Sequence, residues 1–123
     1  MDKKTIIAVD AMGGENSPDK ILHGISLSLK DNKNIYFKLF GNKSQIEEKI
    51  NKYKNIKNFC EIIHADQSIK DDESPLVAAK KNNATSMWKA IESQKNEGAD
   101  ITLSAGNTGA LLVLSRLILK MIN

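Results

Sequence analysis

The chain has 123 residues, of which 41% are hydrophobic and 27% charged, and its formal net charge is +3. This length and composition predict one folded domain and exclude a disordered or low-complexity chain. The lysines are scattered among acidic residues and only 5% of the residues are aromatic, which argues against a nucleic-acid partner.

Strands and helices are predicted to alternate along the chain. Runs of β-branched or small residues bounded by glycine or polar residues predict buried strands at 5–9, 35–41, 59–65 and 101–104. Helical spacing of apolar residues predicts helices after Ser17-Pro18, over 43–54, after Pro75, through Met87 to a stop at Gly98, and over 108–121. This alternation predicts a three-layer α/β/α fold with a mostly parallel sheet.

The last predicted helix is apolar around most of its circumference, which does not suit a helix on the outside of a small domain. We therefore expect residues 1–123 to be a single α/β domain portion, the N-terminal part of a longer chain whose remaining residues or partner cover this helix.

The single cysteine and the short apolar runs of the sequence predict the cellular compartment. Cys60 has no second cysteine to pair with, which suits a reducing compartment, and its apolar neighbours indicate a core residue rather than a nucleophile. The first apolar run is too short for a signal peptide, and no run reaches the ~20 residues of a membrane span. We therefore expect a cytoplasmic protein.

Two loops at the carboxyl ends of strands are chemically unusual. DAMGGENSP (10–18) and SAGNTG (104–109) both join a strand to a helix through glycines and short polar side chains. Ligands of parallel sheets bind at this edge, and a helix N-terminus offers free amides and about half a positive charge. Ser104, Asn107 and Thr108 add donors, so the pattern is typical of an anion site.

Each loop also has a structural interpretation. Taken alone, the second loop is better interpreted as a tight turn with Asn107 or Thr108 as helix N-cap. Gly13-Gly14 is likewise suited to a turn, whereas Asp10 at a strand end is a better functional candidate. Neither loop matches the Walker or dinucleotide fingerprint.

Other polar residues carry weaker signals. His23 and His64 lack partners at metal-ligand spacing, so no metal site is expected. The acidic run 71–73 is interpreted as solvated.

Three segments in order, IAVDAMGGENSP, SPLVAAKKNNATSMWKAI and GADITLSAGNTGALL, together resemble the bacterial acyl-carrier-protein:phosphate acyltransferases of phospholipid synthesis. The resemblance covers essentially the whole chain, but only about the first third of that family's usual length. It implies the fold of the isocitrate and isopropylmalate dehydrogenases and the phosphotransacetylases.

The resemblance also implies a reaction and its partners. A fatty acyl group passes from acyl carrier protein to inorganic phosphate, without a cofactor, and a membrane acyltransferase then uses the acyl phosphate to acylate glycerol 3-phosphate. The family members are typically homodimers that associate peripherally with the membrane.

Site residues follow from the same resemblance. It implies that Asn107 and Asp10 are catalytic. It implies substrate contacts from Ser104, Gly106, Thr108 and Gly109, with Gly13 and Gly14 on the facing side and Lys80 and Ser86 as secondary contacts.

The chain departs from the family pattern at Glu15, where Asp is usual, at Asn83, where a basic residue is usual, and at Thr85-Ser86, where a Ser-Ser pair is usual. The missing positive charge at Asn83 is expected to weaken an electrostatic contact to phosphate or carrier protein. We expect these 123 residues alone to be inactive.

Two alternatives remain: a phosphotransacetylase-like enzyme that uses an acyl-coenzyme A donor, and a noncatalytic ligand-binding module.

Overall fold

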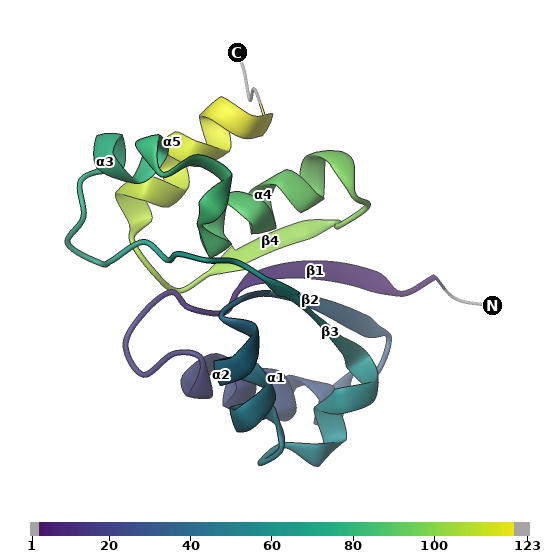
Figure 1. The fold of residues 1–123 in the computed structure, drawn as a ribbon. Helices are drawn as coiled ribbons and strands as arrows, with labels where there is room; N and C mark the ends of the chain where they lie inside the picture. Colours follow the sequence, from purple (N-terminus) through teal and green to yellow (C-terminus); the bar gives the residue numbers. More distant parts are fainter. Residues whose placement is uncertain (1–2, 120–123) are drawn as a thin grey trace.

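The computed structural model describes residues 3–119, and its centre is a four-stranded sheet (Figure 1). The strands are β1 (Thr5–Asp10), β2 (Ile35–Gly41), β3 (Cys60–His64) and β4 (Ile101–Ser104). They lie in the order β3-β2-β1-β4, and every neighbouring pair is parallel. The four predicted strands are confirmed, each to within one residue at either end.

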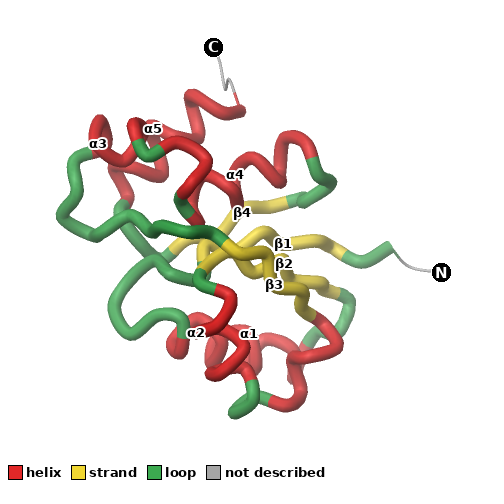
Figure 2. The backbone as a smooth tube through the Cα atoms, in the orientation of Figure 1, coloured by secondary structure: helices red, strands yellow, loops and turns green. Residues whose placement is uncertain are grey.

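Helices cover both faces of this sheet, as Figure 2 shows. On one face lie α1 (Asp19–Asp31), α2 (Lys43–Ile50) and the 3-10 helix η1 (Lys54–Phe59). On the other face lie α3 (Pro75–Lys80), the 3-10 helix η2 (Asn82–Ala84), α4 (Ser86–Asn96) and α5 (Thr108–Leu119). The predicted three-layer α/β/α architecture is confirmed.

The two faces of β1 belong to different parts of the core. Val9 packs with Leu22 in the cluster under α1 and α2, whereas Ala8 packs with Phe40 and Ala90 in the cluster under α4. Successive side chains of a strand point to opposite faces, so an apolar run such as residues 5–9 is what a strand covered on both sides requires.

Apolar side chains remain exposed along β4 and α5. β4 pairs only with β1 among the described residues, and Ile101 and Leu103 on its open face are 48% and 50% exposed. On α5, Leu112 and Leu117 are 64% and 55% exposed, which confirms the predicted apolar outer surface; residues 120 and 121 of the predicted helix lie outside the described residues. No helix within residues 3–119 is long and apolar enough to cross a membrane.

The helix predicted over 43–54 is wrong in its second half. α2 ends at Ile50, and the amide of Tyr53 donates to the Ile50 carbonyl oxygen over 2.9 Å, which tightens the last turn. The chain then continues as η1, which buries Ile56 completely in the core under α1 and α2. Tertiary burial of Ile56 therefore ends the helix earlier than the local sequence pattern indicates.

The start of α1 and the end of α4 were both predicted from single residues. The predicted helix after Ser17-Pro18 is present as α1, but Ser17 does not cap it: its hydroxyl donates to the Gly13 carbonyl oxygen, and α1 has no side-chain cap. Gly98 follows the end of α4 with φ of +81°, so its predicted role as a helix stop is confirmed.

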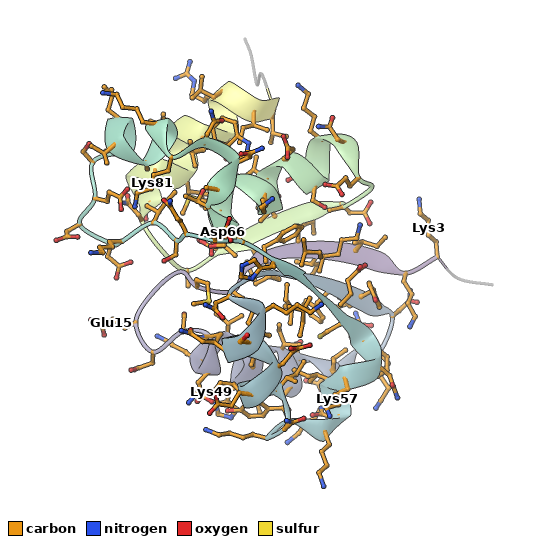
Figure 3. All side chains as sticks on the ribbon, in the orientation of Figure 1. Lys3, Glu15, Lys49, Lys57, Asp66 and Lys81 are labelled. Atoms are coloured by element: carbon orange, nitrogen blue, oxygen red, sulfur yellow. The ribbon has the colours of Figure 1, made fainter. Side chains whose placement is uncertain are left out.

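Polar and apolar side chains separate as the sequence pattern predicts. Lys3 and Lys57 extend from the body of the molecule (Figure 3). Cys60 is half-buried against the core under α1 and α2, and burial raises the pKa of its thiol to about 12. A thiol that ionises this reluctantly suits a core residue rather than a nucleophile.

The chain leaves β1 and β4 toward opposite faces, although these strands are neighbours. β1 leads to α1 on one face, and β4 leads to α5, which packs on α4, on the other. Their last residues, Asp10 and Ser104, are register partners. In open α/β sheets the crevice at such a topological switch point is where ligands bind, and both glycine loops begin there.

Candidate active site

The two glycine loops pack backbone against backbone at the switch point. A Cβ atom added to Gly13 would lie 2.9 Å from Asp10 Oδ2, 2.9 Å from Ser104 Oγ and 3.0 Å from the Gly106 nitrogen. A Cβ atom on Gly106 would lie 3.0 Å from Gly13 Cα. Only glycine permits this approach, so the expectation that the two loops face each other is confirmed.

Gly14 needs glycine for a second reason. Its φ is +86°, a conformation that L side chains rarely adopt, and a Cβ atom there would lie 3.0 Å from the Ala105 carbonyl oxygen. Beyond it, Glu15 is exposed at the outside of the loop (Figure 3). The family difference at Glu15 is therefore a surface change.

Asp10 lies beneath the loops. It is 1% exposed, and Ser86 Oγ donates to its Oδ1 over 2.6 Å while Ser104 Oγ donates to its Oδ2 over 3.0 Å. The Met12 amide also donates to Oδ1, over 3.2 Å. One carboxylate thus ties together the end of β1, the end of β4 and the start of α4.

Burial raises the pKa of Asp10, and the hydrogen bonds from Ser86 and Ser104 only partly oppose that effect. Ser104 Oγ also accepts from the Gly106 amide over 3.2 Å, so the carboxylate supports the second loop indirectly. This geometry gives Asp10 and the buried Ser86 a positioning role, and their predicted contacts with substrate stay predictions.

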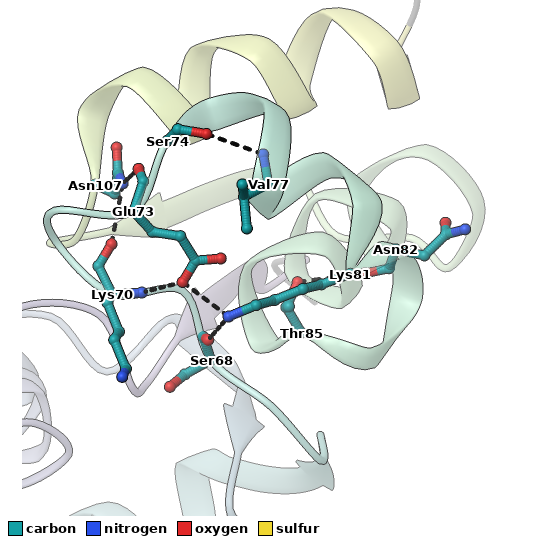
Figure 4. Close-up of polar contacts among 9 residues, drawn as sticks. All are labelled: Ser68, Lys70, Glu73, Ser74, Val77, Lys81, Asn82, Thr85 and Asn107. Carbon is teal, nitrogen blue, oxygen red and sulfur yellow. Dashed lines mark hydrogen bonds and ion pairs between the residues drawn. The ribbon is translucent and has the colours of Figure 1, made fainter.

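Asn107 caps α5. Its Oδ1 accepts from the Ala110 amide over 3.0 Å, and its Nδ2 donates to the carbonyl oxygens of Lys70, over 3.0 Å, and Glu73, over 2.6 Å (Figure 4). The interpretation of Asn107 as an N-cap is confirmed. Both amide protons are engaged, so this conformation leaves none to donate to a substrate, and the predicted catalytic role stays a prediction.

The first turn of α5 holds the donors that remain accessible. The Asn107 side chain accepts from the Ala110 amide, and the Asn107 carbonyl oxygen accepts from the Leu111 amide. Among the described residues no acceptor takes the amides of Thr108 and Gly109, and both residues are exposed. These two amides, at the positive end of a 12-residue helix, are suited to bind an anion.

The predicted substrate contact of Lys80 stays a prediction. Lys80 is the exposed last residue of α3, and no contact in the described part of the chain brings it to the glycine loops. The next residue, Lys81, instead places its Nζ 2.8 Å from Glu73 Oε1.

Glu73 was expected to be solvated together with Asp71 and Asp72, and this is wrong for Glu73 alone. Its side chain is 9% exposed, whereas Asp71 and Asp72 are exposed. Burial raises the pKa of Glu73, but the hydrogen bonds from Lys81 and the Lys70 amide and the charges of both lysines outweigh it and hold the pKa below its usual value. The partners are eight residues apart across a helix, so no local spacing rule indicates them.

The side chains and amides at the switch point are mainly hydrogen-bond donors. No group of three or more His, Cys, Asp or Glu side chains in the described residues is placed to hold a metal ion. His64 bonds to Asp66 over 3.0 Å and His23 stacks on Tyr53, so both have structural contacts. What the switch point offers is two helix amides beside closely packed glycine backbone.

Comparisons with known proteins agree with this geometry. A family described as "Fatty acid synthesis protein" matches residues 5–123. A protein of Pelagibacter ubique named phosphate acyltransferase is 51% identical over 122 residues, 99% of this chain and 36% of that protein. Proteins of the same name from Caulobacter vibrioides and Enterococcus faecalis are 38% and 44% identical, over 98% and 86% of this chain and 34% and 31% of their own lengths.

The chain thus spans about a third of the length of these relatives. It matches the family along nearly all of its own length, including both glycine loops. The chain therefore belongs to the fatty acid synthesis protein family, and the relatives described above carry the name phosphate acyltransferase.

Proposed function

We propose that the protein transfers a fatty acyl group from acyl carrier protein to inorganic phosphate, forming an acyl phosphate for phospholipid biosynthesis. The observation that carries the proposal is the pair of amides of Thr108 and Gly109 at the topological switch point, beside the packed glycine loops. The names of the relatives support the reaction class. The acyl donor rests on the resemblance of the three sequence segments.

In the proposed reaction, phosphate is itself the nucleophile. A phosphate oxygen attacks the thioester carbonyl carbon, the new C–O bond forms, and the C–S bond breaks as the thiolate leaves. The proton of the attacking hydrogen phosphate ends on that thiolate, so the products are an acyl phosphate and a free thiol. No serine or cysteine nucleophile is needed, which agrees with the high pKa of Cys60.

The protein's part is to hold the dianion and stabilise the developing oxyanion. Amides of Thr108 and Gly109 serve the phosphate because they carry the positive end of the α5 dipole. Preorganised donors of this kind are each worth about 10²–10³ in rate. Asp10 keeps the donors in place from below by holding Ser104, which accepts from the Gly106 amide.

The partners belong to the same proposal. Acyl carrier protein delivers the thioester, and a membrane glycerol-3-phosphate acyltransferase consumes the product. We place the protein in the cytoplasm, as a homodimer with peripheral membrane contact. These statements follow from the resemblance.

The donor is tested by incubating the whole protein with inorganic phosphate and either acyl carrier protein or coenzyme A carrying the same acyl chain. Acyl phosphate is followed by its phosphorus NMR signal. We expect acyl phosphate to form when phosphate is incubated with the acyl carrier protein thioester, and to form clearly more slowly with the acyl-coenzyme A thioester. Preference for coenzyme A would favour the phosphotransacetylase-like alternative, and no acyl phosphate from either donor would contradict the proposal.

A further inference from the structure

A largely buried ion pair lies beside the proposed site. The loop of residues 66–74 runs from β3 to α3, and Glu73 near its end meets Lys81 just beyond α3 (Figure 4). Lys81 Nζ donates to Glu73 Oε1 over 2.8 Å and to the Ser68 carbonyl oxygen over 3.3 Å. Their side chains are 27% and 9% exposed, so this contact is largely removed from solvent.

The Glu73 carboxylate also fixes the conformation of its own loop. The Lys70 amide donates to Glu73 Oε1 over 3.2 Å, and the Glu73 amide donates to the Lys70 carbonyl oxygen over 3.1 Å. These two bonds close a turn over residues 70–73. The carboxylate therefore belongs both to the ion pair and to the turn.

The same turn holds the cap of α5. The carbonyl oxygens of Lys70 and Glu73 both accept from Asn107 Nδ2, and Asn107 Oδ1 accepts from the Ala110 amide. A continuous set of hydrogen bonds thus runs from Lys81 through Glu73 and the turn to Asn107 and the first turn of α5. Figure 4 shows the Lys81 ammonium reaching back to Glu73 while the Lys70 side chain points away from the pair.

Stability alone is a weak reason for this pair. Buried ion pairs often contribute no more than apolar side chains of the same volume. Glu73 Oε2 is buried and has no hydrogen-bond partner among the described residues, which costs further free energy. Its placement is better explained by the geometry that it imposes on the turn.

We propose that Glu73 and Lys81 are positioning residues for the phosphate site: the pair sets the turn of 70–73, the turn orients Asn107, and Asn107 aims the amides of Thr108 and Gly109. The inference rests on the proposed function, because it assigns the pair to that same site. Neither residue touches the substrate.

The test compares variants of the whole protein. Lys81→Met and Glu73→Gln remove one charge each, and Lys81→Arg retains the cation. Lys95→Met on α4 and Asp72→Asn in the loop are matched controls, because they make the same chemical changes at exposed positions with no described contact. Two quantities are measured: amide hydrogen exchange over residues 105–111 without substrate, and KM for phosphate and for the thioester.

We expect Lys81→Met and Glu73→Gln to speed exchange over residues 105–111 and to raise KM for phosphate about ten-fold, with KM for the thioester unchanged. Lys81→Arg should recover most of the phosphate affinity, and both control variants should match the wild-type protein. A lower melting temperature with unchanged exchange and unchanged KM for phosphate would overturn the proposal.

Two further outcomes are covered by the design. If Lys81→Met does not fold, Glu73→Gln decides instead: faster exchange with a raised KM for phosphate supports the proposal, and unchanged values of both overturn it. Lys81→Arg then shows whether retaining the cation preserves the phosphate affinity. If the wild-type protein forms no acyl phosphate, the proposed function fails, while the exchange measurement still shows whether the pair orders the start of α5.

Discussion

Replacing Gly13 by alanine tests the contact between the two glycine loops. The added Cβ atom would lie 2.9 Å from both Asp10 Oδ2 and Ser104 Oγ, and 3.0 Å from the Gly106 nitrogen. Ordinary carbon contacts begin at about 3.4 Å, so atoms on three sides must move by about 0.5 Å. Asp10 and Ser104 are hydrogen-bonded to each other and the third atom belongs to the backbone, so none can move alone.

Overpacking of this kind costs about 1–3 kcal/mol of unfolding free energy. It also displaces the second loop from the first, and misplacements below 1 Å at a reacting centre lower rates substantially. We therefore expect Gly13→Ala to lower both the free energy of unfolding and kcat/KM for acyl phosphate formation, the latter by about ten-fold or more.

The matched control is Gly24→Ala on α1. Apart from its chain neighbours and the adjacent backbone of its own helix, no atom of the described residues lies within 4 Å of a Cβ atom at Gly24, and alanine in a helix interior stabilises by about 0.5–1 kcal/mol. Urea unfolding and steady-state kinetics on the whole protein compare the two variants. If Gly13→Ala were as stable and active as Gly24→Ala, the close packing of the loops would be wrong.

The remaining predictions concern the two buried polar side chains under the site. Because the pKa of Asp10 is raised above 3.8 in the folded protein, its ionisation opposes folding as the pH rises through that pKa. We therefore compare the unfolding free energies of the wild-type protein and Asp10→Asn by urea titration at different pH values. The wild-type value minus the Asp10→Asn value should fall as the pH rises from about 3.8 and then level off. A difference that rises with pH would contradict the burial argument. Asn107→Ala removes a helix cap and leaves the carbonyl oxygens of Lys70 and Glu73 without their donor, so it should lower the unfolding free energy by about 2–4 kcal/mol. Loss of activity in Asn107→Ala with an unchanged unfolding free energy would instead support the predicted catalytic role of Asn107.

Local patterns predicted most of the fold. The run TIIAV and the segment ITLS became β1 and β4 because buried parallel strands need apolar residues on both faces. Both glycine loops follow the carboxyl end of a strand in the sequence, which predicted that they lie at the same edge of the sheet, and the structure packs them together there. What these signals share is that each can be read within about ten residues.

The features that local patterns did not indicate depend mostly on contacts between residues distant in the sequence. Asn107 bonds to residues 37 and 34 positions earlier, which no spacing rule connects. Glu73 looked like one member of a solvated acidic run, and only the path of α3 brings Lys81 back to it. The early end of α2 likewise reflects burial of Ile56 rather than helix propensity.

The central claim is that the first amides of α5 bind phosphate. Thr108→Pro tests it, because proline fits the first position of a helix while removing the amide hydrogen. Thr108→Ala is the control, since it keeps the amide and removes only the hydroxyl.

The decisive measurement is kcat/KM for phosphate in acyl phosphate formation by the whole protein carrying each substitution. The account predicts a loss of about 10²–10³ for Thr108→Pro and a much smaller loss for Thr108→Ala. Equal values for Thr108→Pro and the wild-type protein, with both folded, would contradict it.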